Sequence, residues 1–83
     1  MDLPAEIARR RERIERLEQA LETELSIDEE IDTVGGLVTS IFGQIPRVGE
    51  RTSYRGFEVE VLAAEKKRVN RVRFRRVPVG SPA

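Results

Sequence analysis

The apolar residues of this chain change their spacing once, and that change constrains the fold more than any other feature. Between Thr33 and Phe42 they follow the period of an α-helix along one face, at Val34, Leu37, Val38, Ile41 and Phe42. Gly43 is a typical residue at a helix C-terminus, and Pro46 prevents the helix from resuming. Farther on, apolar and charged residues alternate as in a half-buried strand, with the apolar ones at Phe57, Val59, Val61 and Ala63. A helix is therefore followed by strands with one apolar face.

Three strands are expected after this helix. They cover residues 51–54, 57–63 and 68–77, with turns at Arg55-Gly56 and over residues 65–67. In the last strand Val69 is out of phase with Val72, which predicts a β-bulge near Asn70. We therefore expect an α+β fold in which a small antiparallel sheet packs against two helices.

The other helix is expected at the N-terminus, from Pro4 to Glu24. Proline is favoured at the first position of a helix, and the apolar residues approach a heptad spacing at Leu3, Ile7, Ile14, Leu17 and Leu21. We therefore expect residues 1–24 to form a charged helical segment. Asp32 or Thr33 is expected to cap the later helix. Residues 78–83, which contain Pro, Gly and Ser, are expected to be disordered.

The net charge is zero because two oppositely charged halves cancel. Residues 1–50 contain 12 acidic and 6 basic side chains, whereas residues 51–83 contain 3 and 9. The basic run over residues 66–76 could contact nucleic acid or an anionic membrane. On a strand, however, Arg71, Arg73 and Arg75 share a face and could pair with Glu58 and Glu60. The chain also lacks an aromatic platform for stacking bases, so we expect a salt-linked sheet face and no nucleic-acid partner.

Composition disfavours both catalysis and membrane insertion. The chain has 83 residues, no cysteine and no histidine, which excludes thiolate and imidazole metal sites and histidine-based triads. Its serines therefore have no histidine to activate them. No apolar run approaches the roughly 20 residues that span a bilayer. We expect no enzyme and no transmembrane segment within this chain.

A run of acidic residues before the later helix is a candidate site for a divalent cation such as Mg²⁺ or Ca²⁺. The candidate ligands are Asp28, Glu29, Glu30 and Asp32. Three of them have the 1, 3, 5 spacing of an EF-hand loop, but the template fails at its later positions, which fall on Thr33 and Thr39. The alternative is a solvated acidic loop that stabilises the next helix through the helix dipole.

A second candidate site lies in the first turn of that helix. Gly35 and Gly36, which follow Thr33, could present backbone N–H groups to a phosphate. The chain has no G-x-G-x-x-G motif and no P-loop lysine. The alternative is that these glycines allow another backbone segment to pack closely.

Residues 29–50, with the sequence EEIDTVGGLVTSIFGQIPRVGE, carry a specific pattern. An acidic lead enters a D-T-x-G-G-hydrophobic helix at Asp32, Thr33, Gly35, Gly36 and Leu37. A G-x-[IL]-P-x-x-G-[ED] turn follows at Gly43, Ile45, Pro46, Gly49 and Glu50. Two strands come next, YRGFEVEVL (54–62) and KKRVNRVRFRRV (66–77). In this pattern the chain resembles the CorC/HlyC transporter-associated domain over residues 25–77.

The resemblance implies a C-terminal accessory domain of membrane proteins that are named magnesium/cobalt efflux proteins or haemolysins. In such proteins the domain follows a membrane domain and paired CBS modules. We therefore expect a non-catalytic domain on the cytoplasmic face of the plasma membrane. It would modulate ion transport through contacts with those domains or with a second copy in a homodimer. The family usually opens with a strand, whereas residues 1–16 have a helical pattern. We expect that edge strand to be absent or this end to be divergent.

The resemblance also leaves two alternative functions open. The family fold is grouped with FAD-binding-like α+β domains, which implies by fold analogy that FAD or an adenine nucleotide binds near Thr33, Gly35 and Gly36. The other alternative is divalent-cation sensing by the acidic loop.

Overall fold

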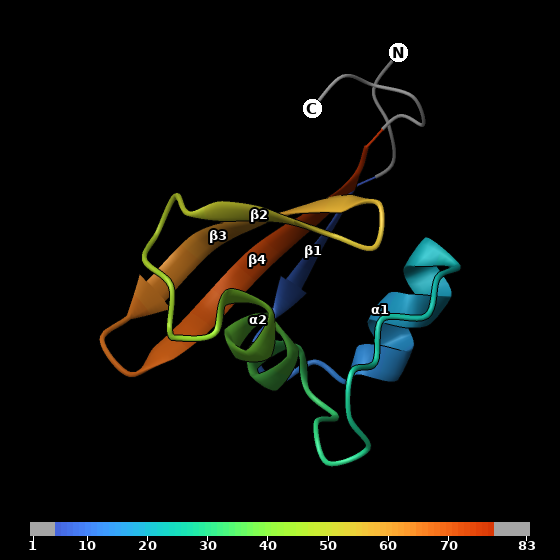
Figure 1. Cartoon of the computed structure of the whole chain (residues 1–83), viewed down its shortest axis with the longest axis horizontal. Coiled ribbons are helices and arrows are strands. Elements are labelled where there is room, and N and C mark those ends of the chain that lie inside the picture. The colour runs from blue at the N-terminus through green and yellow to red at the C-terminus, as the bar shows by residue number, and fades with distance from the viewer. Residues whose placement is uncertain (1–4, 78–83) are drawn as a thin grey trace.

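The computed structural model describes residues 5–77 and shows a four-stranded antiparallel sheet with two helices on one of its faces (Figure 1). The elements, in chain order, are β1 (Ala5–Arg9), α1 (Ile14–Leu21), α2 (Val34–Phe42), β2 (Arg51–Tyr54), β3 (Phe57–Glu65) and β4 (Arg68–Arg76). The strands lie in the order β1-β4-β3-β2. The predicted α+β class, with its antiparallel sheet and two helices, is confirmed.

The elements after residue 33 lie where their apolar periods predict. α2 ends at Gly43, whose φ of 76° is in the left-handed region, and the Gly43 N–H donates to the Thr39 carbonyl at 2.9 Å. The pairing of β3 with β4 shifts twice, so that Leu62 on β3 and Asn70 on β4 have no direct partner. The bulge expected near Asn70 is thus confirmed, and a second irregularity occurs at Leu62.

The expected N-terminal helix is wrong over residues 5–13, and residues 1–4 lie outside the described residues. Residues Ala5–Arg9 form an edge strand in which Ala8 lies opposite Val72 of β4, and α1 begins only at Ile14. Tertiary contacts override weak local propensity here, because the strand completes the sheet and buries Ala8. We expected the family's edge strand to be absent or this end to be divergent, and the strand is present. The expected disorder of residues 78–83 falls outside the described residues.

The expected side-chain cap of α2 is also wrong. Thr33 occupies the N-cap position without a side-chain hydrogen bond. Instead, the N–H groups of Val34 and Gly35 donate to the carbonyls of Glu12 and Arg10, at 2.9 and 3.0 Å. The connection between β1 and α1 therefore satisfies donors that an isolated helix would leave unpaired.

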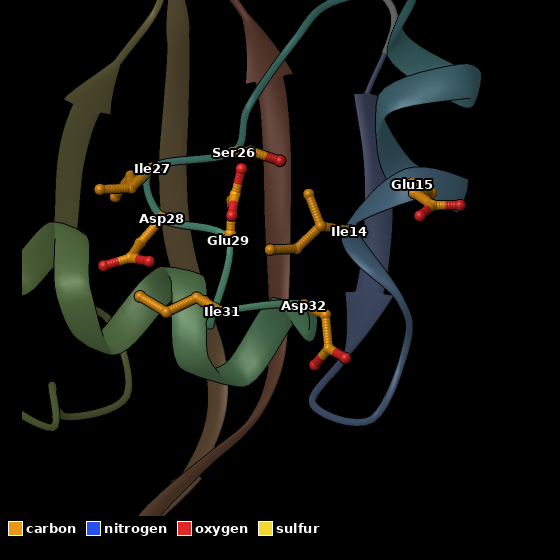
Figure 2. A pocket seen from close by; sticks show the side chains of 8 residues that line it. All are labelled: Ile14, Glu15, Ser26, Ile27, Asp28, Glu29, Ile31 and Asp32. Carbon is orange, nitrogen blue, oxygen red and sulfur yellow. The ribbon is translucent and has the colours of Figure 1, made fainter.

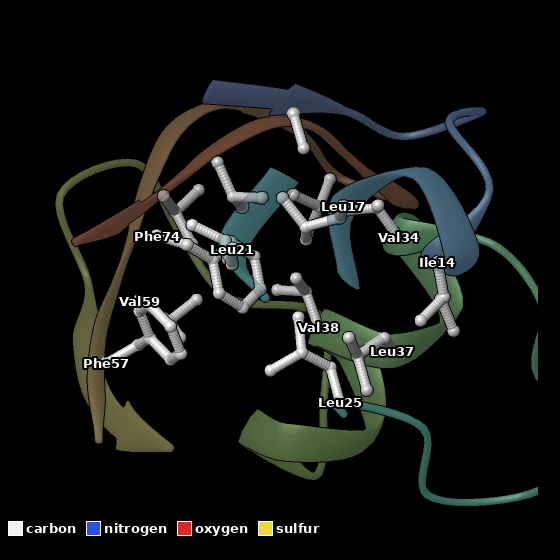
Figure 3. Packing of buried hydrophobic residues seen from close by; sticks show 14 residues of the cluster. Ile14, Leu17, Leu21, Leu25, Val34, Leu37, Val38, Phe57, Val59 and Phe74 are labelled. Carbon is white, nitrogen blue, oxygen red and sulfur yellow. The ribbon is translucent and has the colours of Figure 1, made fainter. Parts of the chain in front are cut away.

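One hydrophobic core lies between the sheet and the helices (Figure 3). Phe57 and Phe74, from adjacent strands, pack edge to face with ring centroids 6.4 Å apart. The core contains these buried side chains: Ala8, Ile14, Leu17, Leu21, Leu25, Val34, Leu37, Val38, Phe57, Val59, Val61, Val69, Val72 and Phe74. Residues of β1 and α1 thus share one core with residues of α2 and the later strands.

Candidate functional sites

The acidic run lies in the loop between α1 and α2, beside a pocket of about 350 Å³ (Figure 2). The pocket is lined by apolar and acidic side chains and one serine: Ile14, Glu15, Ser26, Ile27, Asp28, Glu29, Ile31 and Asp32. Within the loop, the Asp28 carboxylate accepts the N–H of Glu30 and the Asp28 carbonyl accepts the N–H of Ile31, both at 3.0 Å. These two bonds hold the loop in a turn.

The four candidate metal ligands do not converge on one point. In Figure 2 the carboxylates of Asp28 and Asp32 point in different directions, and Asp32 lies 3.8 Å from the guanidinium of Arg13. Glu30 does not line the pocket. Within residues 5–77 no group of three or more acidic side chains is arranged to hold a metal ion. Cation binding by Asp28, Glu29, Glu30 and Asp32 stays a prediction.

The acidic loop begins at an anchor around Leu25 that sequence analysis missed. One oxygen of Glu18 accepts the N–H of Leu25 at 2.7 Å and both the N–H and the hydroxyl of Ser26, at 3.1 and 3.2 Å. The hydroxyl of Tyr54 donates to the Leu25 carbonyl at 2.6 Å. The bond from Leu25 is the main cause of a lowered pKa of Glu18, with Ser26 and Arg55 acting in the same direction against a raising effect of burial.

Two arginines from the strand layer complete this anchor. Arg55, in the turn between β2 and β3, donates to the carbonyls of Glu24 and Ser26 at 3.3 Å each. Arg76, at the end of β4, donates to the Leu21 carbonyl at 2.8 Å. These partners are distant in the sequence, so no local spacing indicates the contacts.

The Gly35-Gly36 pair packs against neighbouring segments. A Cβ at Gly35 would lie 2.5 Å from Cγ of Arg10 and 3.3 Å from its carbonyl oxygen, and a Cβ at Gly36 would lie 3.1 Å from a methyl group of Ile31. The close packing that we considered as the alternative is thus observed at Gly35. Binding of FAD or an adenine nucleotide by Thr33, Gly35 and Gly36 stays a prediction.

The face of the sheet away from the helices carries paired charges. The strand register places Glu60 between Arg51 and Arg73, and it places Glu58 beside Arg75. Arg75 bonds Glu58 at 2.8 Å, and Arg73 bonds Glu60. The salt-linked sheet face that the alternation predicts is confirmed.

The same face has an excess of positive charge near its β1 edge. Arg9 on β1 lies opposite Arg71 on β4, and neither forms an ion pair with another residue in the range 5–77. Ile7, opposite Arg73 in the register, is 56% exposed. We refer to Ile7, Arg9, Arg51, Glu58, Glu60, Arg71, Arg73 and Arg75 as the charged sheet face.

Comparison with known proteins identifies the class of domain. The family model described as a transporter associated domain, CorC_HlyC, matches residues 11–78. The chain is 41% identical over 69 residues to the magnesium and cobalt efflux protein CorC of Salmonella typhimurium, which covers 83% of this chain and 23% of that protein. The fold and the matched residues define a transporter-associated domain. The chain belongs to the CorC/HlyC family of such domains.

Solved structures of the family have the same fold. The transporter associated domain CorC_HlyC from Nitrosomonas europaea has a TM-score of 0.77 and 28% identity, over 88% of this chain and 87% of that one. The domain of a Xylella fastidiosa Temecula1 hemolysin, in complex with Mg²⁺ and Mn²⁺, has a TM-score of 0.73 and 24% identity, over 89% of each chain.

The chain corresponds to only a part of its curated relatives. The chain spans about a quarter of the length of the curated relatives it matches, 23% for the Salmonella typhimurium protein. The part of the chain that the structure describes contains no helix that is long and apolar enough to cross a membrane.

Proposed function

We propose that the chain is a non-catalytic regulatory domain of an Mg/Co efflux protein of the haemolysin-like class, and that it modulates ion transport through contacts with neighbouring domains. The observation that carries the proposal is the 41% identity to CorC of Salmonella typhimurium. The partners would be the CBS and membrane domains of such a protein, or a second copy of this domain, at the cytoplasmic face of the plasma membrane.

The charged sheet face supports a role in docking. Its ion pairs are partly exposed, with Arg75 and Glu58 having 49% and 25% of their side-chain surface accessible, and such pairs typically contribute about 0–1 kcal/mol to stability. These ion pairs therefore contribute little to the stability of the sheet, and their side chains can also bind a partner. Positive and negative side chains alternate at fixed positions on this face. A partner surface with the complementary charge pattern would therefore dock in one preferred alignment.

The residue types support binding without chemistry. The chain has no histidine and no cysteine, so its hydroxyl groups lack the usual activating base. The carboxylates beside α1, such as Glu15 and Asp28, line a pocket that contains no basic side chain. This arrangement suits attraction of a positively charged group more than it suits catalysis.

A domain exchange in the Salmonella typhimurium relative tests the proposal. The matched segment is deleted in one strain and replaced by this chain in another, and cobalt efflux from the cells is measured. We expect deletion to change the efflux and the exchange to restore it. Identical efflux with and without the segment would overturn the proposal.

A charge-reversal variant of the exchanged domain tests the docking face. Arg73→Glu/Arg75→Glu on the charged sheet face should fail to restore regulated efflux. Arg11→Glu/Arg16→Glu makes the same change in net charge at exposed residues outside the sheet, and it should restore efflux. Thermal unfolding of both purified variants separates a docking defect from a folding defect. Restoration by both variants would remove the sheet face from the proposal.

A second candidate function is divalent-cation sensing by the acidic loop. It is favoured by the Mg²⁺ and Mn²⁺ complex of the Xylella fastidiosa domain and by the acidic lining of the pocket beside α1. The ligands would be Asp28, Glu29, Glu30 and Asp32, which the loop would have to bring together around the ion.

Titration of Mg²⁺, Co²⁺ and Ca²⁺ distinguishes this sensing function. Affinity is measured for the unchanged chain and for Asp28→Asn/Glu30→Gln, with Glu22→Gln/Glu24→Gln as a charge-matched control. Sensing by the loop predicts that only the first double variant loses affinity. Equal affinity in all three proteins would exclude these ligands.

A further inference from the structure

A second pocket, of about 430 Å³, concentrates positive charge beside α2. Arg10 reaches it from the connection between β1 and α1, Lys67 from the turn between β3 and β4, and Arg68 from the first position of β4. No aspartate or glutamate lines it, whereas the pocket beside α1 is lined by Glu15, Asp28, Glu29 and Asp32. In a chain with 15 acidic and 15 basic residues, this separation produces a local positive potential.

The lining of this cationic pocket includes three apolar side chains, Ile31, Ile45 and Val69, besides the hydroxyl residues Thr33, Thr39 and Ser40. Val69 is buried, and Ile31 and Ile45 pack against the hydrophobic core. A pocket lined by both apolar and cationic side chains suits an organic anion, whose charged group contacts the cations and whose body covers the apolar side chains. Lysine and arginine are the side chains that bind phosphate through charge-assisted hydrogen bonds.

Arg10 is held in position by its backbone and its side-chain stem. Its N–H donates to the Asn70 carbonyl and its carbonyl accepts the Gly35 N–H, both at 3.0 Å. Its stem packs so closely on Gly35 that a Cβ there would lie 2.5 Å from Arg10 Cγ. Gly35 therefore makes room for the stem of a cationic side chain that lines the pocket.

Two N–H groups at the N-terminus of α2 are not available to an anion, because those of Val34 and Gly35 already donate to backbone carbonyls. The cationic side chains are therefore the main candidates for recognition. Arg68 lies 3.3 Å from Glu65, which offsets part of its charge. Arg10 and Lys67 form no ion pair within residues 5–77.

We infer that the cationic pocket binds a phosphorylated small molecule with an apolar or aromatic body, such as a nucleotide. The phosphate lies beside Arg10 and Lys67, and the body covers the partly buried Ile31 and Ile45. Thr33, Gly35 and Gly36 also line this pocket, so the inference places the nucleotide expected there on the side chains of Arg10 and Lys67. The pocket shares no residue with the charged sheet face, so the inference does not depend on the proposed docking function.

Titration of ADP, inorganic pyrophosphate and adenosine into the full 83-residue chain tests the inference. The solution contains no divalent cation, and binding is followed by amide chemical shifts. We expect ADP to shift the amides of residues 67–69 and to bind more tightly than pyrophosphate or adenosine. Lys67→Glu should weaken ADP binding by about tenfold or more because it replaces an attractive charge by a repulsive one.

Lys66→Glu is the matched control, because it makes the same change in net charge one residue away and lines a different pocket. We expect it to change ADP affinity by about twofold or less, because Lys66 is exposed, lines another pocket and is partly screened by salt. Equal weakening by the two variants would overturn the inference, since it would indicate diffuse attraction. Absence of ADP binding, or adenosine binding as tight as that of ADP, would also overturn it. Circular dichroism checks folding, and Lys67→Gln replaces Lys67→Glu if the latter is unfolded.

Discussion

Glu18 and Leu25 are joined at the end of α1, where the Glu18 carboxylate accepts the Leu25 N–H at 2.7 Å. Ser26 donates its N–H and its hydroxyl to the same oxygen. A carboxylate with several donors is stabilised relative to its protonated form, and the Leu25 bond above all lowers the pKa of Glu18. Because the unfolded chain lacks these bonds, they stabilise the fold only while Glu18 is ionised.

Acid should therefore weaken the fold partly through Glu18. Its folded-state pKa lies below the value of about 4.3 for an unfolded glutamate, so its contribution is complete above that value and is lost as the pH falls through the folded-state pKa. We expect Glu18→Gln to cost about 1 kcal/mol at pH 7. The variant should then lose less further stability than the unchanged chain as the solution is acidified from about pH 5 to pH 3. Thermal unfolding over this range measures both effects.

Glu15→Gln is the control for this prediction. Glu15 lies on the same helix and its side chain makes no hydrogen bond or ion pair within residues 5–77. Its variant should follow the pH profile of the unchanged chain. Parallel profiles for all three proteins would show that the Glu18 anchor contributes nothing to acid stability.

Tyr54 holds the other backbone group of Leu25, through a 2.6 Å bond from its hydroxyl to the Leu25 carbonyl. Tyr54→Phe keeps the ring but removes this donor, and we expect a loss of about 1 kcal/mol in the free energy of unfolding. Since Glu18 and Tyr54 hold the same residue, Glu18→Gln/Tyr54→Phe should lose about 0.5 kcal/mol less than the sum of the single losses. Urea denaturation measures the four proteins. Strictly additive losses would mean that the two bonds act independently.

The contrast between α2 and β1 shows how much of the fold the sequence predicts. α2 carries its apolar face and its terminal glycine within ten residues of one another, so local spacing is sufficient. β1 buries only Ala8 and leaves Ile7 exposed. The strand owes its structure to pairing with β4, at the other end of the chain. Ile7 and Ile14 have a heptad spacing, yet they lie on different elements.

The candidate sites also differ in how far the sequence predicts them. The pairing of Glu58 with Arg75 could be predicted because alternation sets the face of a strand and a short turn sets the register. The anchor around Leu25 could not, because its partners come from α1, β2 and the turn after β2. In the sequence, Arg10 lies between Ile7 and Ile14 of the near-heptad series, and nothing there indicates a contact with Gly35. The structure shows it packed on Gly35.

Gly35 should be less tolerant of alanine than Gly36. A Cβ at Gly35 would meet Arg10 Cγ at 2.5 Å and the Arg10 carbonyl oxygen at 3.3 Å. Overpacking of this kind costs about 1–3 kcal/mol, against a gain of about 1 kcal/mol in helix propensity. At Gly36 the nearest atom is an Ile31 methyl at 3.1 Å, which can shift slightly.

We therefore expect Gly35→Ala to lower the urea midpoint clearly and Gly36→Ala to leave it nearly unchanged. Both variants add one methyl group to the first turn of the same helix, so each controls for the other. Equal midpoints would show that the contact with Arg10 is not what requires glycine at position 35.

The ion pair between Arg75 and Glu58 should couple weakly and respond to salt. A double-mutant cycle with Arg75→Gln and Glu58→Gln is expected to give about 0.2–1 kcal/mol at 0.1 M salt. The coupling should fall at 1 M salt, because the screening length shortens from about 10 Å to about 3 Å. Arg71→Gln with Glu58→Gln is the control cycle, because Arg71 lies opposite Ala63 in the register, and it should give a coupling near zero. Equal coupling in the two cycles would contradict a specific pair and would leave only the general attraction between the strands' opposite charges.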